Sequence, residues 1–231
     1  MMPSRADVRM LQMGQQRVAQ MARNELAGWW ATIDKSDPVK LRAEVERFFP
    51  VLVESYGEVA ATAAADWYDM IYAERPRMAA GMRDEEGARA RAGWAIGKAW
   101  EGDVPQALST LQLVTDEMVR QFGRDTIVQS AGANKRMWAR IPSGSETCPY
   151  CLTMASRGFA YHTKEAAGGL NPDKFHGGCD CEIVADDGKV PKGYDPDKMY
   201  KIYEDVHEQG DTLSDVVVKL RAKHGTEISI V

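Results

Sequence analysis

All four cysteines of this 231-residue chain lie in two short clusters in its last third. The first reads Cys148-Pro-Tyr-Cys151, and the second, after 24 intervening residues, reads His176-Gly-Gly-Cys179-Asp-Cys181. Thiolates and imidazole at such spacings are ligands that a tetrahedral zinc ion prefers. Because both clusters would have to meet at one ion, they constrain this part of the fold more than any other feature.

Five side chains compete for about four ligand positions around one ion. Two of the cysteines are two residues apart, so on a strand their side chains share one face. One alternative is an all-cysteine site with the histidine outside it. The other is three cysteines plus the histidine, with Cys179 or Cys181 spare. The spacing leaves both open, and the candidate ligands are Cys148, Cys151, His176, Cys179 and Cys181.

The pattern favours a structural Zn²⁺ over a catalytic one. Neither the H-x-E of the zinc deaminases nor an H-E-x-x-H occurs in the chain. A full set of thiolates also makes zinc a poor Lewis acid, so we expect no enzymatic activity. The alternative is a zinc-dependent nucleic-acid-binding protein or nuclease, for which His162 and Asn171 lie between the clusters, although without the expected Asp-His dipeptide.

Composition bounds the class of protein and its partners. Hydrophobic residues make up 44% and charged residues 27% of the chain, as in ordinary globular proteins. No run of about 18 apolar residues occurs, so no membrane partner is expected. The first 141 residues carry 19 basic and 19 acidic side chains, so the whole net charge of -5 falls on the rest. Arg83, Arg89 and Arg91 could line a groove for DNA, but the pattern favours a solvated face.

Apolar spacing of three and four residues predicts a helical domain over residues 1–140. Pro50 lies inside the second helix, and we expect a kink or break near Phe49. Gly, Pro, Asp and Asn then become frequent, which places a domain boundary near residue 140. The predicted helices cover residues 5–33, 38–72, 84–100 and 103–131.

Residues 141–231 are predicted to form a second, smaller unit. A short strand should include Cys181 and Ile183, and a Gly/Pro/Asp-rich loop should cover residues 182–197. Two helical pieces follow at 197–208 and 213–224, and a β-prone tail at 227–231 could add to a sheet edge. The predicted fold class is α+β: a mainly α-helical N-terminal part with a small zinc-stapled C-terminal α/β module.

Three segments around the cysteines resemble a known family. They are Ile141 to Cys151, Ala155 to Tyr161 and Phe175 to Cys181. Together they resemble the C-terminal region of phage Mu protein F-like head morphogenesis proteins, in particular the minor capsid proteins of actinobacterial phages and prophages. The resemblance covers roughly residues 140–185. The chain departs from the usual family form at Gly177-Gly178 and at Asp180.

This resemblance implies a structural component of the virion. The expected role is a minor capsid protein of the capsid interior or portal region that acts in head assembly or genome delivery. The implied partners are the portal and the major capsid protein, with self-association into a homo-oligomer and a weak contact with packaged DNA as further expectations. The helical domain would dock or self-associate, and the protein would pass through the host cytoplasm during assembly.

Overall fold

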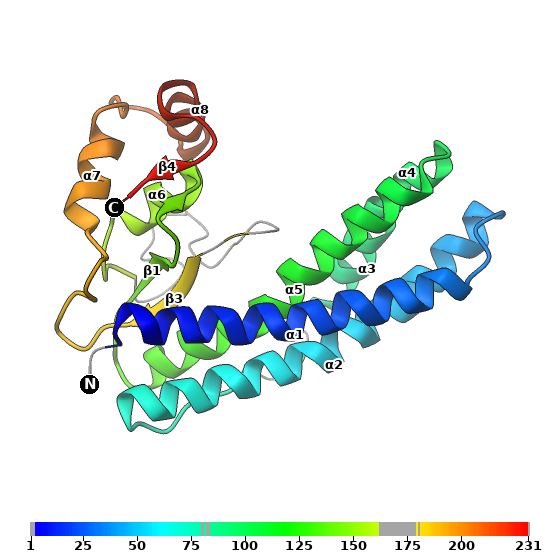
Figure 1. Cartoon of the computed structure of the whole chain (residues 1–231), viewed down its shortest axis with the longest axis horizontal. Coiled ribbons are helices and arrows are strands. Elements are labelled where there is room, and N and C mark those ends of the chain that lie inside the picture. Colours follow the sequence, from blue (N-terminus) through cyan, green and yellow to red (C-terminus); the bar gives the residue numbers. More distant parts are fainter. Residues whose placement is uncertain (1–2, 80, 82–83, 162–178, 180, 231) are drawn as a thin grey trace.

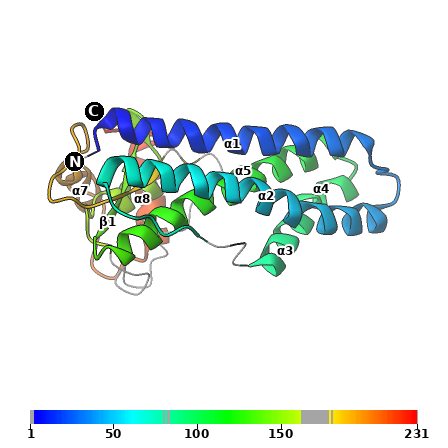
Figure 2. The ribbon, with the colours of Figure 1, turned by 90° about the horizontal axis from the view of Figure 1, so that it is seen from below.

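A computed structural model describes residues 3–79, 81, 84–161, 179 and 181–230. Three long helices run side by side along the molecule, and two short ones, α3 and α4, pack against them (Figure 1). Seen from below, the three long helices still lie together (Figure 2). The helices of this bundle are α1 (Arg5–Thr32), α2 (Pro38–Tyr72), α3 (Glu85–Ala95), α4 (Gly97–Trp100) and α5 (Val104–Ala133).

Each long helix begins at a side chain that satisfies the free backbone N–H groups of the first turn. Ser4 and Asp7 form a reciprocal capping box at the start of α1. Asp37 accepts from two backbone N–H groups and precedes a proline in the first turn of α2. Asp103 caps α5 by accepting a hydrogen bond from the backbone N–H of Gln106. These local signals explain why the predicted helix starts are close to the observed ones.

Two predictions about helix continuity are corrected. Of the kink or break expected near Phe49, the break is wrong, because α2 continues through Pro50 as one helix of 35 residues. Pro50 and Phe49 are both buried in that helix, so tertiary packing holds it together where the local signal favours an interruption. The helix expected over residues 84–100 is instead two helices, which meet at Ile96.

The described residues of the smaller unit form two short antiparallel ribbons and three helices. In the first ribbon, β1 (Trp138–Pro142) pairs with β3 (Cys181–Ala185), and Arg140 lies opposite Ile183. In the second, β2 (Glu146–Thr147) pairs with β4 (Ile228–Ser229), so the β-prone tail adds to an edge of its own chain. The helices are α6 (Pro149–Ala155), α7 (Pro196–Glu204) and α8 (Leu213–His224).

The strand near the second cysteine cluster is longer and more buried than predicted. The loop expected over residues 182–197 is wrong at its start, because β3 runs to Ala185. All five residues of β3 are buried. The bundle covers the ribbon on one side, where α1 and α5 contact β3, and α6 packs on β1. A two-sided cover removes the apolar–polar alternation that a half-exposed strand would show.

The two parts of the chain share one apolar cluster at their junction. Leu11 of α1, Tyr72 of α2 and Ile127 of α5 pack in the same cluster as Trp138 and Tyr161. The fold class α+β is confirmed, whereas the domain boundary near residue 140 stays a prediction. In the part of the chain that the structure describes, no helix is both long enough and apolar enough to cross a lipid bilayer.

Candidate metal centre

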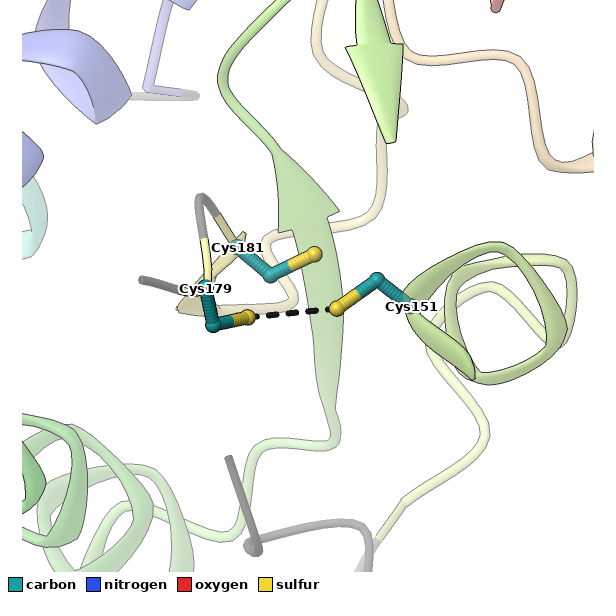
Figure 3. A group of neighbouring side chains, drawn as sticks. All are labelled: Cys151, Cys179 and Cys181. Atoms are coloured by element: carbon teal, nitrogen blue, oxygen red, sulfur yellow. Dashed lines mark hydrogen bonds between the residues drawn. The ribbon is translucent and has the colours of Figure 1, made fainter. Parts of the chain in front are cut away.

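Three of the five candidate ligands lie together at the junction between the bundle and the smaller unit. The sulfur atoms of Cys151, Cys179 and Cys181 all lie within 4.8 Å of one another. Cys151 comes from α6, whereas Cys181 begins β3 and Cys179 precedes it, and all three side chains point to one place (Figure 3). The Sγ atoms of Cys151 and Cys179 are 3.1 Å apart. Each of the three residues is at most 1% exposed.

This arrangement fits a thiolate-bound zinc ion. A tetrahedral ion with Zn–S bonds of about 2.3 Å holds its sulfurs about 3.8 Å apart. The sulfurs lie within 4.8 Å of one another and the pair Cys151–Cys179 is 3.1 Å apart, so the observed spacings bracket that value. The side chains approach from α6 and from the start of β3. Zn²⁺ there would supply a crosslink between α6 and β3. The residues that would hold it are Cys151, Cys179 and Cys181.

The remaining two candidates differ in what the structure says of them. Cys148 is the N-cap residue of α6, and its sulfur accepts from the backbone N–H of Cys151 at 3.4 Å. It therefore lies beside the group of three without belonging to it. His176 lies outside the described residues, as do His162 and Asn171. Neither Cys179 nor Cys181 is spare in this geometry, because both belong to the group.

Arg140 of β1 directs its guanidinium at the thiols. Its Nη2 lies 3.7 Å from the sulfur of Cys151 and 3.6 Å from that of Cys179. The residue is fully buried, and its guanidinium lies 5.3 Å from the centre of the Tyr150 ring. A buried cation at this distance offsets the negative charge that several thiolates would bring to one ion.

The pKa values of two of the thiols are shifted in opposite directions. Hydrogen bonds with Cys148 and Cys179 raise the pKa of Cys151 well above its usual range. Hydrogen bonds from Cys151 and Cys181 lower the pKa of Cys179, and the charges of Arg140 and Arg124 act in the same direction. Burial by itself would lower the pKa of Arg140, but the charges of the three cysteines raise it instead. Cys179 is thus the thiol that the surroundings prepare as a thiolate.

A buried chain of charges anchors the strand that carries the thiols. Arg120 of α5 pairs with Glu182 of β3 at 2.8 Å and with Asp116 at 3.5 Å. Arg124, one turn further on, lies 3.7 Å from the other oxygen of Glu182. Its Nη2 donates to the backbone carbonyl of Cys181 at 3.0 Å. These contacts fix β3 against α5 and so fix the direction in which its thiols point.

These buried ion pairs could not be predicted from the sequence. Asp116, Arg120 and Arg124 follow one another at four-residue spacing, a pattern that a solvated helix face shows equally often. Glu182 follows Cys181 directly, where the predicted loop would have exposed it. Arg120 and Arg124 are buried in the structure, and only that burial distinguishes a supporting layer from a solvated face.

Two of the three arginines that could line a groove for DNA, Arg89 and Arg91, make contacts within the bundle. Arg89 pairs with Glu85 and donates to the backbone carbonyl of Glu46. Arg91 pairs with Glu117. Both contacts favour the solvated, ion-paired face over a groove for nucleic acid. Arg83 lies outside the described residues.

The chain is similar to two curated phage proteins. It is 33% identical over 116 residues to the Gene 15 protein of Mycobacterium phage D29, an alignment covering 36% of this chain and 42% of that protein. It is 31% identical over 120 residues to the Gene 15 protein of Mycobacterium phage L5, covering 35% and 40% respectively. The chain thus spans about two fifths of the length of these relatives. No solved structure matches it.

A family model extends this similarity over most of the chain. It is described as VG15 protein and matches residues 2–206. That range includes the helical bundle, the three thiols, and the arginines and glutamate that hold them. Relatives and family model agree on a phage protein, and the chain belongs to the VG15 protein family.

Proposed function

We propose that this protein is a phage minor capsid protein of the Mu protein F-like type. It would be a non-enzymatic component of the capsid interior or portal region, acting in head assembly or genome delivery. The observation that carries the proposal is the buried thiol group at the junction of the two parts. Its three cysteines are buried, which suits a structural crosslink better than a site that a substrate must enter.

The metal role in this proposal is to make the molecule rigid. Zn²⁺ held by Cys151, Cys179 and Cys181 would tie α6 to β3, which is already held to α5 by the Glu182 ion pairs. Cys148 or His176 would complete the set of four ligands. A small unit with short strands gains much of its folding free energy from such a site.

The far end of the bundle offers a docking surface for the portal or the major capsid protein. Trp94 is 72% exposed near the end of α3, and Trp100 is 48% exposed at the end of α4. In Figure 1 α4 lies at the end of the molecule away from β1 and β3. Tryptophan is enriched at the centres of protein interfaces, where it contributes much of the binding energy. The same surface would serve self-association into a homo-oligomer.

The decisive experiment is quantitative mass spectrometry of purified phage particles and procapsids. We expect this protein at low copy number relative to the major capsid protein, and fewer filled heads when its gene is disrupted. The double variant W94S/W100S should remain folded but be depleted from particles. Val218→Ser removes another exposed apolar side chain, on α8, and should leave incorporation unchanged. A protein that is present in lysates but absent from particles and procapsids would contradict the proposal.

A further inference from the structure

One face of α1 is basic, although the chain as a whole is acidic. Between Arg5 and Asn24 there are four arginines and four glutamines, while Asp7 is the only acidic residue. The carboxylate of Asp7 is taken up by the capping box with Ser4. The net charge of the whole chain is -5, so α1 concentrates positive charge on an otherwise negative molecule.

Two hollows lie along this face of α1. The first has a volume of about 620 Å³ and is lined by Arg5, Arg9 and Gln12 with the loop of residues 143–145. Arg5 also donates to the carbonyl of Gly144 at 2.9 Å, which holds that loop beside the helix. The hollow therefore combines side chains of the bundle with a loop of the smaller unit.

The second hollow continues along the same face. It has a volume of about 430 Å³, and its lining includes Gln16, Arg17, Gln20 and Arg23. Its one acidic lining residue, Asp116, is only 5% exposed and is paired with Arg23 and Arg120. On α1 the lining residues include positions 5, 9, 12, 16, 20 and 23, which are three or four apart, and Arg17 lies at the edge of the face that they share.

Two arginines on this face are available to a ligand. Arg9 and Arg17 are exposed, and neither has an acidic partner among the described residues. From Arg5 to Arg23 the helix rises about 27 Å, close to the length of eight base-pair steps of duplex DNA at about 3.4 Å each. Arginine and glutamine side chains are common donors to phosphate oxygens.

We infer that this face of α1, the α1 stripe, binds the phosphodiester backbone of duplex DNA without reading its sequence. A membrane surface fits less well, because the apolar side of α1 is buried in the bundle and cannot enter lipid. A protein partner fits less well because the large exposed apolar residues that line the two hollows, Met13 and Leu113, include no aromatic anchor of the kind that protein interfaces favour. The inference goes beyond the assembly role and does not depend on it.

Fluorescence anisotropy of the full chain with a labelled 20-base-pair duplex between 50 and 200 mM salt tests the α1 stripe. We expect R9Q/R17Q to weaken binding at 50 mM salt about tenfold or more, and to reduce the slope of log K against log salt by about 1.8. R9K/R17K keeps both charges and should retain most of the affinity. R75Q/R77Q removes two exposed arginines from the segment after α2 and should change little.

Three results would overturn the inference. One is equal binding by the wild type and R9Q/R17Q. Another is an equal loss in R75Q/R77Q, which would mean that total charge decides and not the α1 stripe. The third is binding to anionic lipid vesicles or to polyglutamate without binding to the duplex. Far-ultraviolet circular dichroism checks that each variant remains folded, and the charge-preserving R9K/R17K separates loss of charge from loss of fold. Absence from phage particles would contradict the assembly role but not this one.

Discussion

Arg140 is the buried cation that contacts the thiols of the candidate metal centre. A guanidinium that is fully buried is costly unless opposite charge surrounds it. Its two sulfur contacts, to Cys151 and Cys179, supply that charge if the thiols are ionised. Metal binding requires the same ionised state. The arginine and the ion would therefore stabilise one form of the site together.

Replacing Arg140 by methionine should weaken zinc binding. The substitution keeps much of the side-chain volume but removes the charge. Loss of a residue that supports the metal ligands lowers metal affinity by roughly 10–100-fold. Competition against a chromophoric zinc chelator measures the change. Arg157→Met removes an exposed arginine of the same unit and should leave zinc affinity unaltered. An R140M protein with wild-type affinity would contradict the charge argument.

The ion pair between Glu74 and Arg136 gives a pH dependence with a defined sign. Arg136 binds both oxygens of Glu74, at 2.7 and 3.0 Å, and lowers the pKa of that carboxyl below 4.5. Because the pKa of Glu74 is lower in the folded protein than in the unfolded chain, the ion pair stabilises the fold fully at pH values above the unfolded pKa. That stabilisation is lost as the pH falls through the folded value.

We therefore expect Glu74→Gln to destabilise the protein at pH 7 by at most about 1 kcal/mol, because both side chains are partly exposed. The difference from the wild type should shrink below about pH 4.5. Urea unfolding at pH 7, 5 and 3.5 measures it. A difference that is constant or that grows towards acid would show that the carboxylate charge is not what stabilises the contact.

Helix packing depends on two glycines that allow close approach. A Cβ built on Gly57 of α2 would lie 2.5 Å from the ring of Phe122 in α5. One built on Gly123 of α5 would lie 2.3 Å from the amide of Gln15 in α1. Each glycine is in the middle of a helix, where it lowers intrinsic helix stability. These glycines therefore stabilise the bundle by letting neighbouring helices approach closely, and not through helix propensity.

Gly57→Ala should destabilise the bundle by about 1–3 kcal/mol through overpacking against Phe122. The matched control is Gly28→Ala in α1, where a Cβ meets nothing within 4 Å. That change should stabilise the protein by up to about 1 kcal/mol, because alanine is the better helix former. Thermal unfolding of both variants measures the two free-energy changes. Equal effects at the two sites would mean that helix propensity alone decides.

On the scale of the whole molecule, the thiol group and the bundle are coupled through a common core. Cys151, Cys179 and Cys181 belong to the same apolar cluster as Tyr68 and Tyr72 of α2. Glu182 adds the buried ion pairs to α5. Disturbing the thiol group should therefore affect the adjoining ends of the long helices as well as the smaller unit.

Cys181→Ser should lower zinc content and expose a specific set of amides to hydrogen exchange. We expect faster exchange in β1, β3 and α6 and in the C-terminal half of α5, with α3 and α4 keeping their protection. Mass spectrometry of exchange in the variant, and in the wild type treated with a chelator, should give the same pattern. Loss of protection across all helices alike would mean that the molecule unfolds as one unit. Unchanged exchange in α5 would mean that the coupling through the shared core is absent.

Much of the architecture could be predicted because its causes are local. Caps such as Asp37 and apolar spacing of three and four residues place the long helices close to their observed limits. Cysteine spacing likewise indicated the segment that could hold a metal. Of the kink or break predicted near Phe49, the break does not occur, because burial of the surrounding helix outweighs the local preference.

The sequence by itself determined the three long helices, the α+β class and the identity of the candidate ligands, since periodicity, caps and residue chemistry act over a few neighbours. Only the tertiary structure decided which thiols meet, that Arg140 and Arg124 support them, and that Glu182 is buried. Those contacts join residues far apart in the chain, such as Arg120 and Glu182, and no local pattern encodes them. Burying these charges between α5 and β3 is costly unless every partner is in place. Only the folded chain brings those partners together.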